Sequence, residues 1–261
     1  MQLRDSITDA GPQDAGMVVV SGSHGGLYPA SLASDAALRA VVFNDAGRGL
    51  DDAGISGVMA LDKISMAAAA VDCMSARIGD AGDALAHGRI SALNRGAGAL
   101  GVTVDMTLRQ AVALLASAPQ PSGKLPPYQE VRTTCIPRPG GEAIFLLDSA
   151  SMVGSEHAGK IVVTGSHGGL IGGDPKRALK APARVAVFND AGLGPDEIGA
   201  ARLSALEGQS LAAVTLAASS ARIGDARSAY ESGIISRANE PARRLGAHEG
   251  LRLRDWLAEI A

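Results

Sequence analysis

The sequence predicts an α/β protein built as two tandem, pseudo-twofold-related halves with mainly parallel sheets. Three pairs of short blocks recur along the 261-residue chain, which indicates an internal duplication. In both copies, short apolar runs that suit buried strands alternate with segments of helical composition. Such alternation is typical of parallel sheets with crossover helices. The repeated blocks are residues 18–27 and 161–170, 42–47 and 187–192, and 75–80 and 220–225.

The elements of the first copy can be predicted in order along the chain. Three apolar runs rich in Val and Ala predict buried strands at residues 17–21, 40–43 and 66–71. The predicted helices, which have helix-compatible composition, are residues 28–38, 55–63, 80–87 and 94–100. An amphipathic pattern predicts a closing helix at residues 108–116, and residues 251–260 repeat this pattern at the end of the second copy.

Proline separates the two copies. Six of the 12 prolines fall between residues 119 and 141, a composition typical of a linker that is stiff in places. We therefore expect a first α/β repeat at residues 1–118, a linker at residues 119–141 and a second repeat at residues 142–261. Within the linker, residues 130–136 are expected to be extended.

The composition argues against several classes of partner. The net charge of −3 and the aromatic content of 3% provide neither the cationic surplus nor the stacking rings that nucleic-acid surfaces need. No signal peptide is visible, and no apolar run reaches membrane-spanning length. Cys73 and Cys135 do not make a disulfide framework, which favours a reducing compartment. We expect a cytoplasmic protein that binds neither nucleic acid nor membrane.

Each repeated block follows a predicted strand. The carboxyl ends of parallel strands share one edge of the sheet, and ligands bind at that edge. The blocks agree between the copies even in polar residues that a core does not need, whereas the sequence between them differs. We therefore expect the blocks to form a site at these edges or in a cleft between the halves.

The first block, Gly-Ser-His-Gly-Gly, supplies groups for proton transfer and hydrogen bonding. His24 and His167 can act as general acid or base, as metal ligands or as hydrogen-bond donors. Alternatively, each histidine only hydrogen-bonds a carbonyl of the turn. Ser23 and Ser166 can cap the next helix, contact a ligand or act as a nucleophile. The glycines whose N–H groups can face a ligand are Gly25, Gly26, Gly168 and Gly169.

The second block, Asn-Asp-Ala-Gly, supplies a carboxylate in each copy. Asp45 and Asp190 can orient a histidine, bind a metal or act as a base, and Asn44 and Asn189 can contact a substrate. The same four residues are also good turn formers, so an Asx-type turn explains the pattern equally well.

The third block, Ser-Ala-Arg-Ile-Gly-Asp, supplies an arginine in each copy. Arg77 and Arg222 can clamp a carboxylate or a phosphate through two hydrogen bonds. An ion pair with a nearby aspartate is the alternative. The flanking serines, which can add a hydrogen bond to the ligand, are Ser75 and Ser220.

Cys73 is the main chemical difference between the copies, since Ala218 occupies the corresponding position. A thiol beside Arg77 would have a lowered pKa and could act as a nucleophile, although a small buried cysteine is the alternative. The predicted architecture is similar to that of aspartate/glutamate racemase-type enzymes, whose two α/β halves bind a small carboxylate between them. Those enzymes carry a cysteine in each half, so Ala218 disfavours a two-thiol racemase.

These residues lead to three hypotheses. The first is an enzyme that acts on a small anionic, carboxylate-bearing metabolite. The reaction that we favour for this enzyme is hydrolysis of an amide or cyclic amide C–N bond, because glycine N–H groups can stabilise an oxyanion. The second is an isomerase, a racemase or a lyase that acts on a small carboxylate. The third is a non-catalytic ligand-binding or enzyme-assembly subunit.

The sequence predicts no cofactor and no metal. It lacks a P-loop, a dinucleotide-binding fingerprint and the common metal-ligand spacings. A metal site would need the two edges to meet, and its candidate ligands are His24, His167, Asp45 and Asp190. The expected partners are a small anionic substrate and further copies of the chain, or the other subunits of a small enzyme complex. One composite site and two separate sites both remain open.

Overall fold

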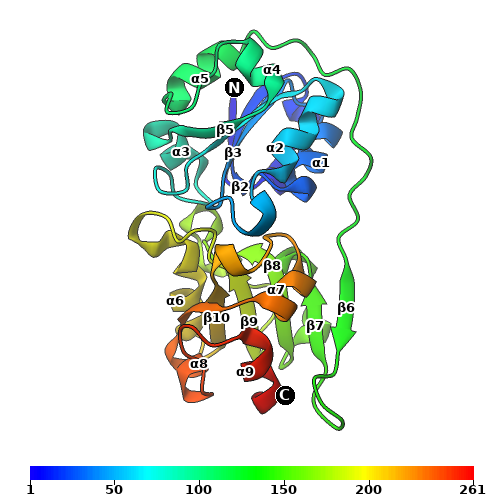
Figure 1. The fold of residues 1–261 in the computed structure, drawn as a ribbon, viewed down its shortest axis with the longest axis vertical. Helices are drawn as coiled ribbons and strands as arrows, with labels where there is room; N and C mark the ends of the chain where they lie inside the picture. The colour runs from blue at the N-terminus through cyan, green and yellow to red at the C-terminus, as the bar shows by residue number, and fades with distance from the viewer.

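The computed structural model describes all 261 residues and shows two α/β halves stacked along the long axis of the molecule (Figure 1). The predicted fold class is confirmed. The N-terminus lies in the upper half and the C-terminus in the lower half, and the linker runs down one side between them. No helix has both the length and the apolar character needed to cross a membrane.

The sheet of the first half has five strands in the order β1-β2-β3-β4-β5. The first four strands are parallel to one another, and β5 is antiparallel to β4. The strands are β1 (Gln2–Arg4), β2 (Val18–His24), β3 (Ala40–Asn44), β4 (Ala67–Val71) and β5 (Ile90–Leu93). The three predicted strands correspond to β2, β3 and β4, whereas the sequence analysis missed β1 and β5.

The sheet of the second half has six strands in the order β11-β10-β9-β8-β7-β6. Its four central strands are parallel, and both edge strands are antiparallel to their neighbours. The sixth strand comes from the extended segment of the linker. The strands are β6 (Arg132–Cys135), β7 (Ile144–Leu147), β8 (Ile161–His167), β9 (Val185–Asn189), β10 (Ala212–Leu216) and β11 (Ile235–Ala238).

Helices cover both faces of each sheet. Successive residues of a strand point to opposite faces, so Val18 and Val20 pack in one core of the first half and Val19 in the other. On the first sheet, α1 (Leu27–Asp35) and α2 (Ser56–Ala60) lie opposite α3 (Ala81–His87), α4 (Arg95–Ala99) and α5 (Leu108–Leu115). On the second sheet, α6 (Ala201–Glu207) lies opposite α7 (Ala226–Ser232), α8 (Glu240–Arg244) and α9 (Leu253–Ile260).

The two halves differ after their first block. In the first half, α1 follows β2, as predicted. In the second half, two short 3-10 turns at Ile171–Gly173 and Pro175–Arg177 take its place. Gly172 has a φ of +61°, which is left-handed backbone, and Pro175 prevents a helix from continuing through this segment. The chain beside the second histidine is therefore an irregular loop.

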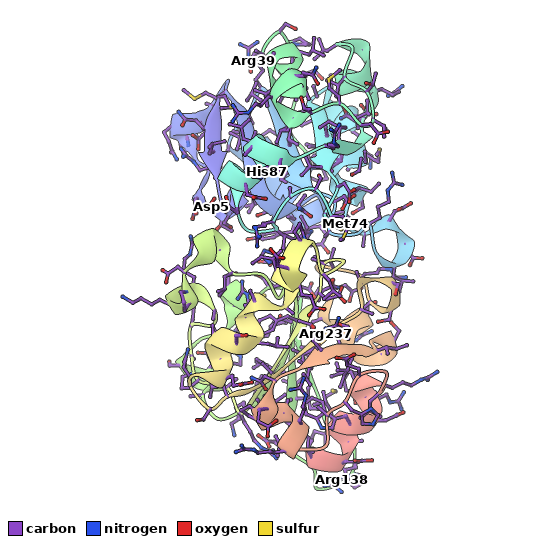
Figure 2. The ribbon with its side chains drawn as sticks, turned by 90° about the vertical axis from the view of Figure 1, so that its left-hand side faces the viewer. Asp5, Arg39, Met74, His87, Arg138 and Arg237 are labelled. Carbon is purple, nitrogen blue, oxygen red and sulfur yellow. The ribbon has the colours of Figure 1, made fainter.

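The carboxyl edges of the two sheets face each other at the junction. A small apolar cluster from both halves fills its centre, made of Ala46, Ile78, Ala191 and Ile223. The backbones meet so closely that a Cβ atom on Gly192 would lie 2.9 Å from the Cα of Gly47. In the view of Figure 2, Asp5 and Met74 lie near the level of the junction, whereas Arg39 and Arg138 lie toward opposite ends of the molecule. The repeated blocks of both halves are thus brought together.

Candidate functional site

A cleft of about 400 Å³ opens at this junction, and matched residues of both halves line it. Because β2 and β8 end at the junction, they deliver the serine and histidine of the first block from opposite sides. The matched pairs in the lining are Ser6 and Ser149, Thr8 and Ser151, Ser23 and Ser166, and His24 and His167. The two copies therefore contribute to one composite cleft.

The hydroxyl groups in the cleft are held by the backbone. Ser23 Oγ accepts the N–H of Ile7 at 3.0 Å, and Ser166 Oγ accepts the N–H of Ala150 at 2.8 Å. Each hydroxyl keeps its own proton as a donor after it has accepted this bond. No hydrogen bond joins either serine to a histidine, so the geometry provides fixed hydroxyl donors and no serine–histidine dyad.

The backbone sets the protonation state of His24. Its Nδ1 accepts the N–H of Gly26 at 3.1 Å, which places the proton of the neutral ring on Nε2. Burial lowers the pKa of His24 to about 4, since the charged ring would lose its hydration. At neutral pH this histidine is therefore an uncharged hydrogen-bond donor.

His167 lies deeper than His24. Its side chain is 7% exposed, and its Nδ1 is buried without a hydrogen-bond partner. Burial lowers the pKa of His167 well below its ordinary value, and the charge of Arg202 and the proximity of His24 lower it further. The ring is therefore neutral, and because the protein encloses Nδ1, a role as general base would have to use Nε2.

Arg202, at the start of α6, is the buried cation of the cleft. It is 3% exposed, and its Cζ lies 5.1 Å from the centroid of the Phe188 ring. Its Nε donates to Gly169 O at 3.0 Å and its Nη1 to Ala178 O at 2.5 Å, whereas Nη2 has no partner in the protein. Burial lowers the pKa of Arg202 to about 10, so the group stays charged at neutral pH, yet no carboxylate pairs with it.

The Asn-Asp-Ala-Gly blocks form turns beside the junction. Asp45 Oδ1 accepts the N–H groups of Gly47 and Cys73, both at 2.9 Å, and Asn44 binds the backbone through both ends of its amide. The corresponding bonds in the second half are made by Asn189 and Asp190. None of these four side chains lines the cleft, and their contacts match the Asx-turn alternative.

The two arginines of the third block join the halves. Arg77 pairs with Asp196, and Arg222 Nη2 lies 2.6 Å from Asp51 Oδ2, so each pair crosses the junction. Neither arginine lines the cleft that contains both histidines. The structure thus supports the ion-pair alternative for both arginines. Besides its partner in the opposite half, each lies near a carboxylate of its own half, Arg77 at 3.8 Å from Asp83 and Arg222 at 3.7 Å from Asp225. The other predicted residues outside the lining are Gly25, Gly26, Gly168, Gly169, Ser75 and Ser220.

Removing Arg222 is expected to have a small effect. The Arg222→Ala variant should lose less than about 1 kcal/mol of unfolding free energy, because Arg222 and Asp51 are about half exposed and water screens their attraction. Chemical denaturation measures this change, and calorimetry with a small carboxylate should show an unchanged affinity. A tenfold loss of affinity would instead support the clamp predicted from the sequence.

The lowered pKa expected for Cys73 is wrong. Burial raises the pKa of this thiol to about 12, and the negative charges of Asp45 and Asp72 add to the effect. Its Sγ lies 4.0 Å from Gly192 O, against the backbone of the opposite half. Cys73 does not line the cleft, so the structure places this residue as a small packing group of the junction.

The ligand set proposed for a metal is not brought together. The only group of side chains with suitable spacing is Asp45, Asp72 and Cys73, and it contains neither histidine. The oxygens of Asp45 already accept bonds from Gly47, Cys73 and Ser91. We assign this group to the turn.

The two buried histidines of the cleft, His24 and His167, should make the stability of the fold depend on pH. In the unfolded chain their pKa returns to about 6.5, so the unfolded state binds protons that the folded state excludes as the pH falls toward 4. Stability is therefore full above pH 6.5 and is lost below it. Between pH 7.5 and pH 5 we expect a loss of about 2 kcal/mol from His24, and the lowered pKa of His167 adds to this loss in the same direction.

Urea denaturation at these two pH values measures this effect. The His24→Gln variant should show a flatter dependence than the unmodified protein. Equal slopes in the two proteins would contradict a neutral, buried His24.

The sequence analysis missed Arg202. Its backbone N–H donates to Gly168 O at 2.8 Å, as the N–H of Gly57 donates to Gly25 O at 2.9 Å in the first half. Arg202 and Gly57 are thus equivalent positions. The only sequence signal for Arg202 was that the second half has an arginine where the first half has a glycine. A search for residues shared by the two halves could not reveal such a difference.

No protein-family model matches this chain, and neither does any curated protein or solved structure.

Proposed function

We propose that this protein is an enzyme that binds a small carboxylate-bearing anion between its halves and hydrolyses an amide or cyclic amide bond in it. The observation that supports anion binding best is Arg202. A buried cation without a carboxylate partner is unfavourable, and an anion in the cleft would supply the missing charge.

The two histidines suit the two halves of such a reaction. The Nε2–H of His24 can donate to the carbonyl oxygen of the substrate and stabilise the negative charge that develops there. His167 can take a proton from the attacking water. Water then adds to the carbonyl carbon, the C–N bond breaks, and the proton held by His167 passes to the departing nitrogen, which leaves a carboxylate and an amine.

The bound anion would tune His167 for this role. The charge of Arg202 contributes to the low pKa of His167 in the free protein. A substrate carboxylate beside Arg202 opposes that effect, so the pKa of His167 rises when the substrate binds. The base thereby becomes stronger only when the substrate is in place.

The groups in the cleft also suit related reactions. Isomerisation or elimination at a small carboxylate also needs a proton acceptor and a hydrogen-bond donor to the carbonyl oxygen. We favour hydrolysis because two neutral histidines and fixed hydroxyls can hold both the water and the carbonyl group.

We place the enzyme in the cytoplasm, where its two free cysteines stay reduced.

The test is a soak of crystals with a mixture of small dicarboxylates, amides and cyclic amides, together with calorimetry of each compound. We expect one ligand per chain, with electron density between Arg202 and a histidine, and release of an amine and a new carboxylate detected by mass spectrometry. Density only outside the cleft, or binding of amides without any product, would contradict the proposal.

A further inference from the structure

The two walls of the cleft differ in charge. Four cationic side chains line it, all from the second half, and no carboxylate belongs to the lining. These side chains are Lys176, Arg177, Lys180 and Arg202. The first half contributes its own members of the matched hydroxyl pairs, His24 and uncharged residues, among them Ile7, Tyr28 and Pro29. A ligand in the cleft therefore meets positive charge on one side only.

Contacts within the protein hold this cationic wall. Lys180 Nζ donates to Ser151 O at 2.7 Å, and two backbone carbonyls fix Arg202. The one carboxylate that pairs with a member of the wall is Asp9, at 3.5 Å from Arg177 Nη2. Most of the positive charge is therefore not neutralised by the protein.

The asymmetry has a local structural cause. At Gly57, the equivalent of Arg202, a Cβ atom would lie 2.0 Å from Gly26 O, so the first half has no room for any side chain there. The lysines lie in the irregular loop that replaces α1 in the second half. Each half thus keeps the matched serine and histidine, but only the second half adds the cations.

We infer that the substrate carries a doubly charged anionic group, a phosphate or a pair of carboxylates, and that this group faces the second half. This inference rests on the proposed function and adds the charge and the orientation of the ligand. The uncharged end then lies against Tyr28 and Pro29, with the reacting carbonyl between the two histidines. Several convergent cations favour a dianion over a monoanion because each adds its own attraction.

The test compares binding of inorganic phosphate, malonate and acetate by calorimetry at pH 7. Phosphate or malonate should bind at least about tenfold more tightly than acetate. The Lys180→Met and Arg202→Met variants should each weaken the dianion about tenfold or more and acetate much less. Lys180 is exposed, so its variant remains informative if the Arg202 variant does not fold. The control is Lys160→Met, an exposed lysine outside the cleft, which should change neither affinity.

The outcomes separate this inference from the proposed function. Tighter binding of phosphate would favour an amide substrate that carries a phosphate group, and tighter binding of malonate one that carries two carboxylates. If acetate binds as tightly as the dianions and small carboxylate-bearing amides are hydrolysed, the inference is wrong and the proposed function stands. An unchanged dianion affinity in the Lys180 variant would also overturn the inference. If no anion binds at all, both fail.

Discussion

Replacing His167 with glutamine should lower turnover of the bound substrate by about 100-fold to 10,000-fold, the usual contribution of a general base. Replacing His24 with glutamine should lower it by up to about 100-fold to 1,000-fold, the usual contribution of one oxyanion donor. The affinity for the anion should change much less, because Arg202 and the lysines hold the charge and remain in place. The measurement is kcat and KM for the compound identified by the ligand screen, together with direct binding by calorimetry.

The exposed His87 and His248 provide matched controls, since neither lines the cleft. Their glutamine variants should retain both turnover and affinity. If the variants of His24 and His167 only weaken binding, the protein is a ligand-binding or assembly subunit and the enzymatic proposal fails. Near-normal turnover in one of the two variants would assign the chemistry to the other histidine alone.

The Gly192→Ala variant should lose about 3 kcal/mol of unfolding free energy. Gly192 has a φ of +78°, a conformation that costs an alanine about 1 kcal/mol. The added Cβ would also lie 2.8 Å from Cys73 Sγ and 2.9 Å from the Cα of Gly47, so the halves would have to separate. Denaturation in urea measures the loss, and a weaker anion affinity should accompany it because the cleft depends on how the halves meet.

Gly208→Ala is the control for this substitution. Gly208 has a φ of −58°, and the new Cβ would lie 3.7 Å from Ala205 O, an ordinary contact distance, so we expect a change within about 0.5 kcal/mol. Adding Cys73→Ala to Gly192→Ala should recover part of the lost stability by removing one of the two close contacts. Full stability in the single variant would contradict the tight junction between the halves.

Much of the fold could be predicted because its signals are local. The central strands β2, β3 and β4 are buried on both faces, so their sequences are continuous apolar runs that stand out from the chain. The edge strand β1 has only three residues and β5 only four, which is too short for a periodic pattern to be recognised. Propensity likewise did not reveal that loop turns replace the expected counterpart of α1.

The site could be predicted only in part. The repeated Ser23, His24, Ser166 and His167 do line the cleft. However, a residue that is identical in both halves can contact a ligand, form a turn or hold the junction. The repeat alone therefore does not show which of these roles the residue has. Asp45 and Arg77 are examples, since the first binds the N–H groups of its own turn and the second pairs with the opposite half.

The sequence by itself determined the plan of two α/β halves, the buried strands and the identity of the paired serines and histidines, since each depends on residues close together in the chain. Only the tertiary structure decided that the two edges face each other and share one cleft. It also decided that the charges there come from Arg202 and the loop of the second half. Those contacts join residues far apart in sequence. The burial of Arg202 and the net charge of the cleft therefore depend on tertiary packing, which a local sequence pattern does not predict.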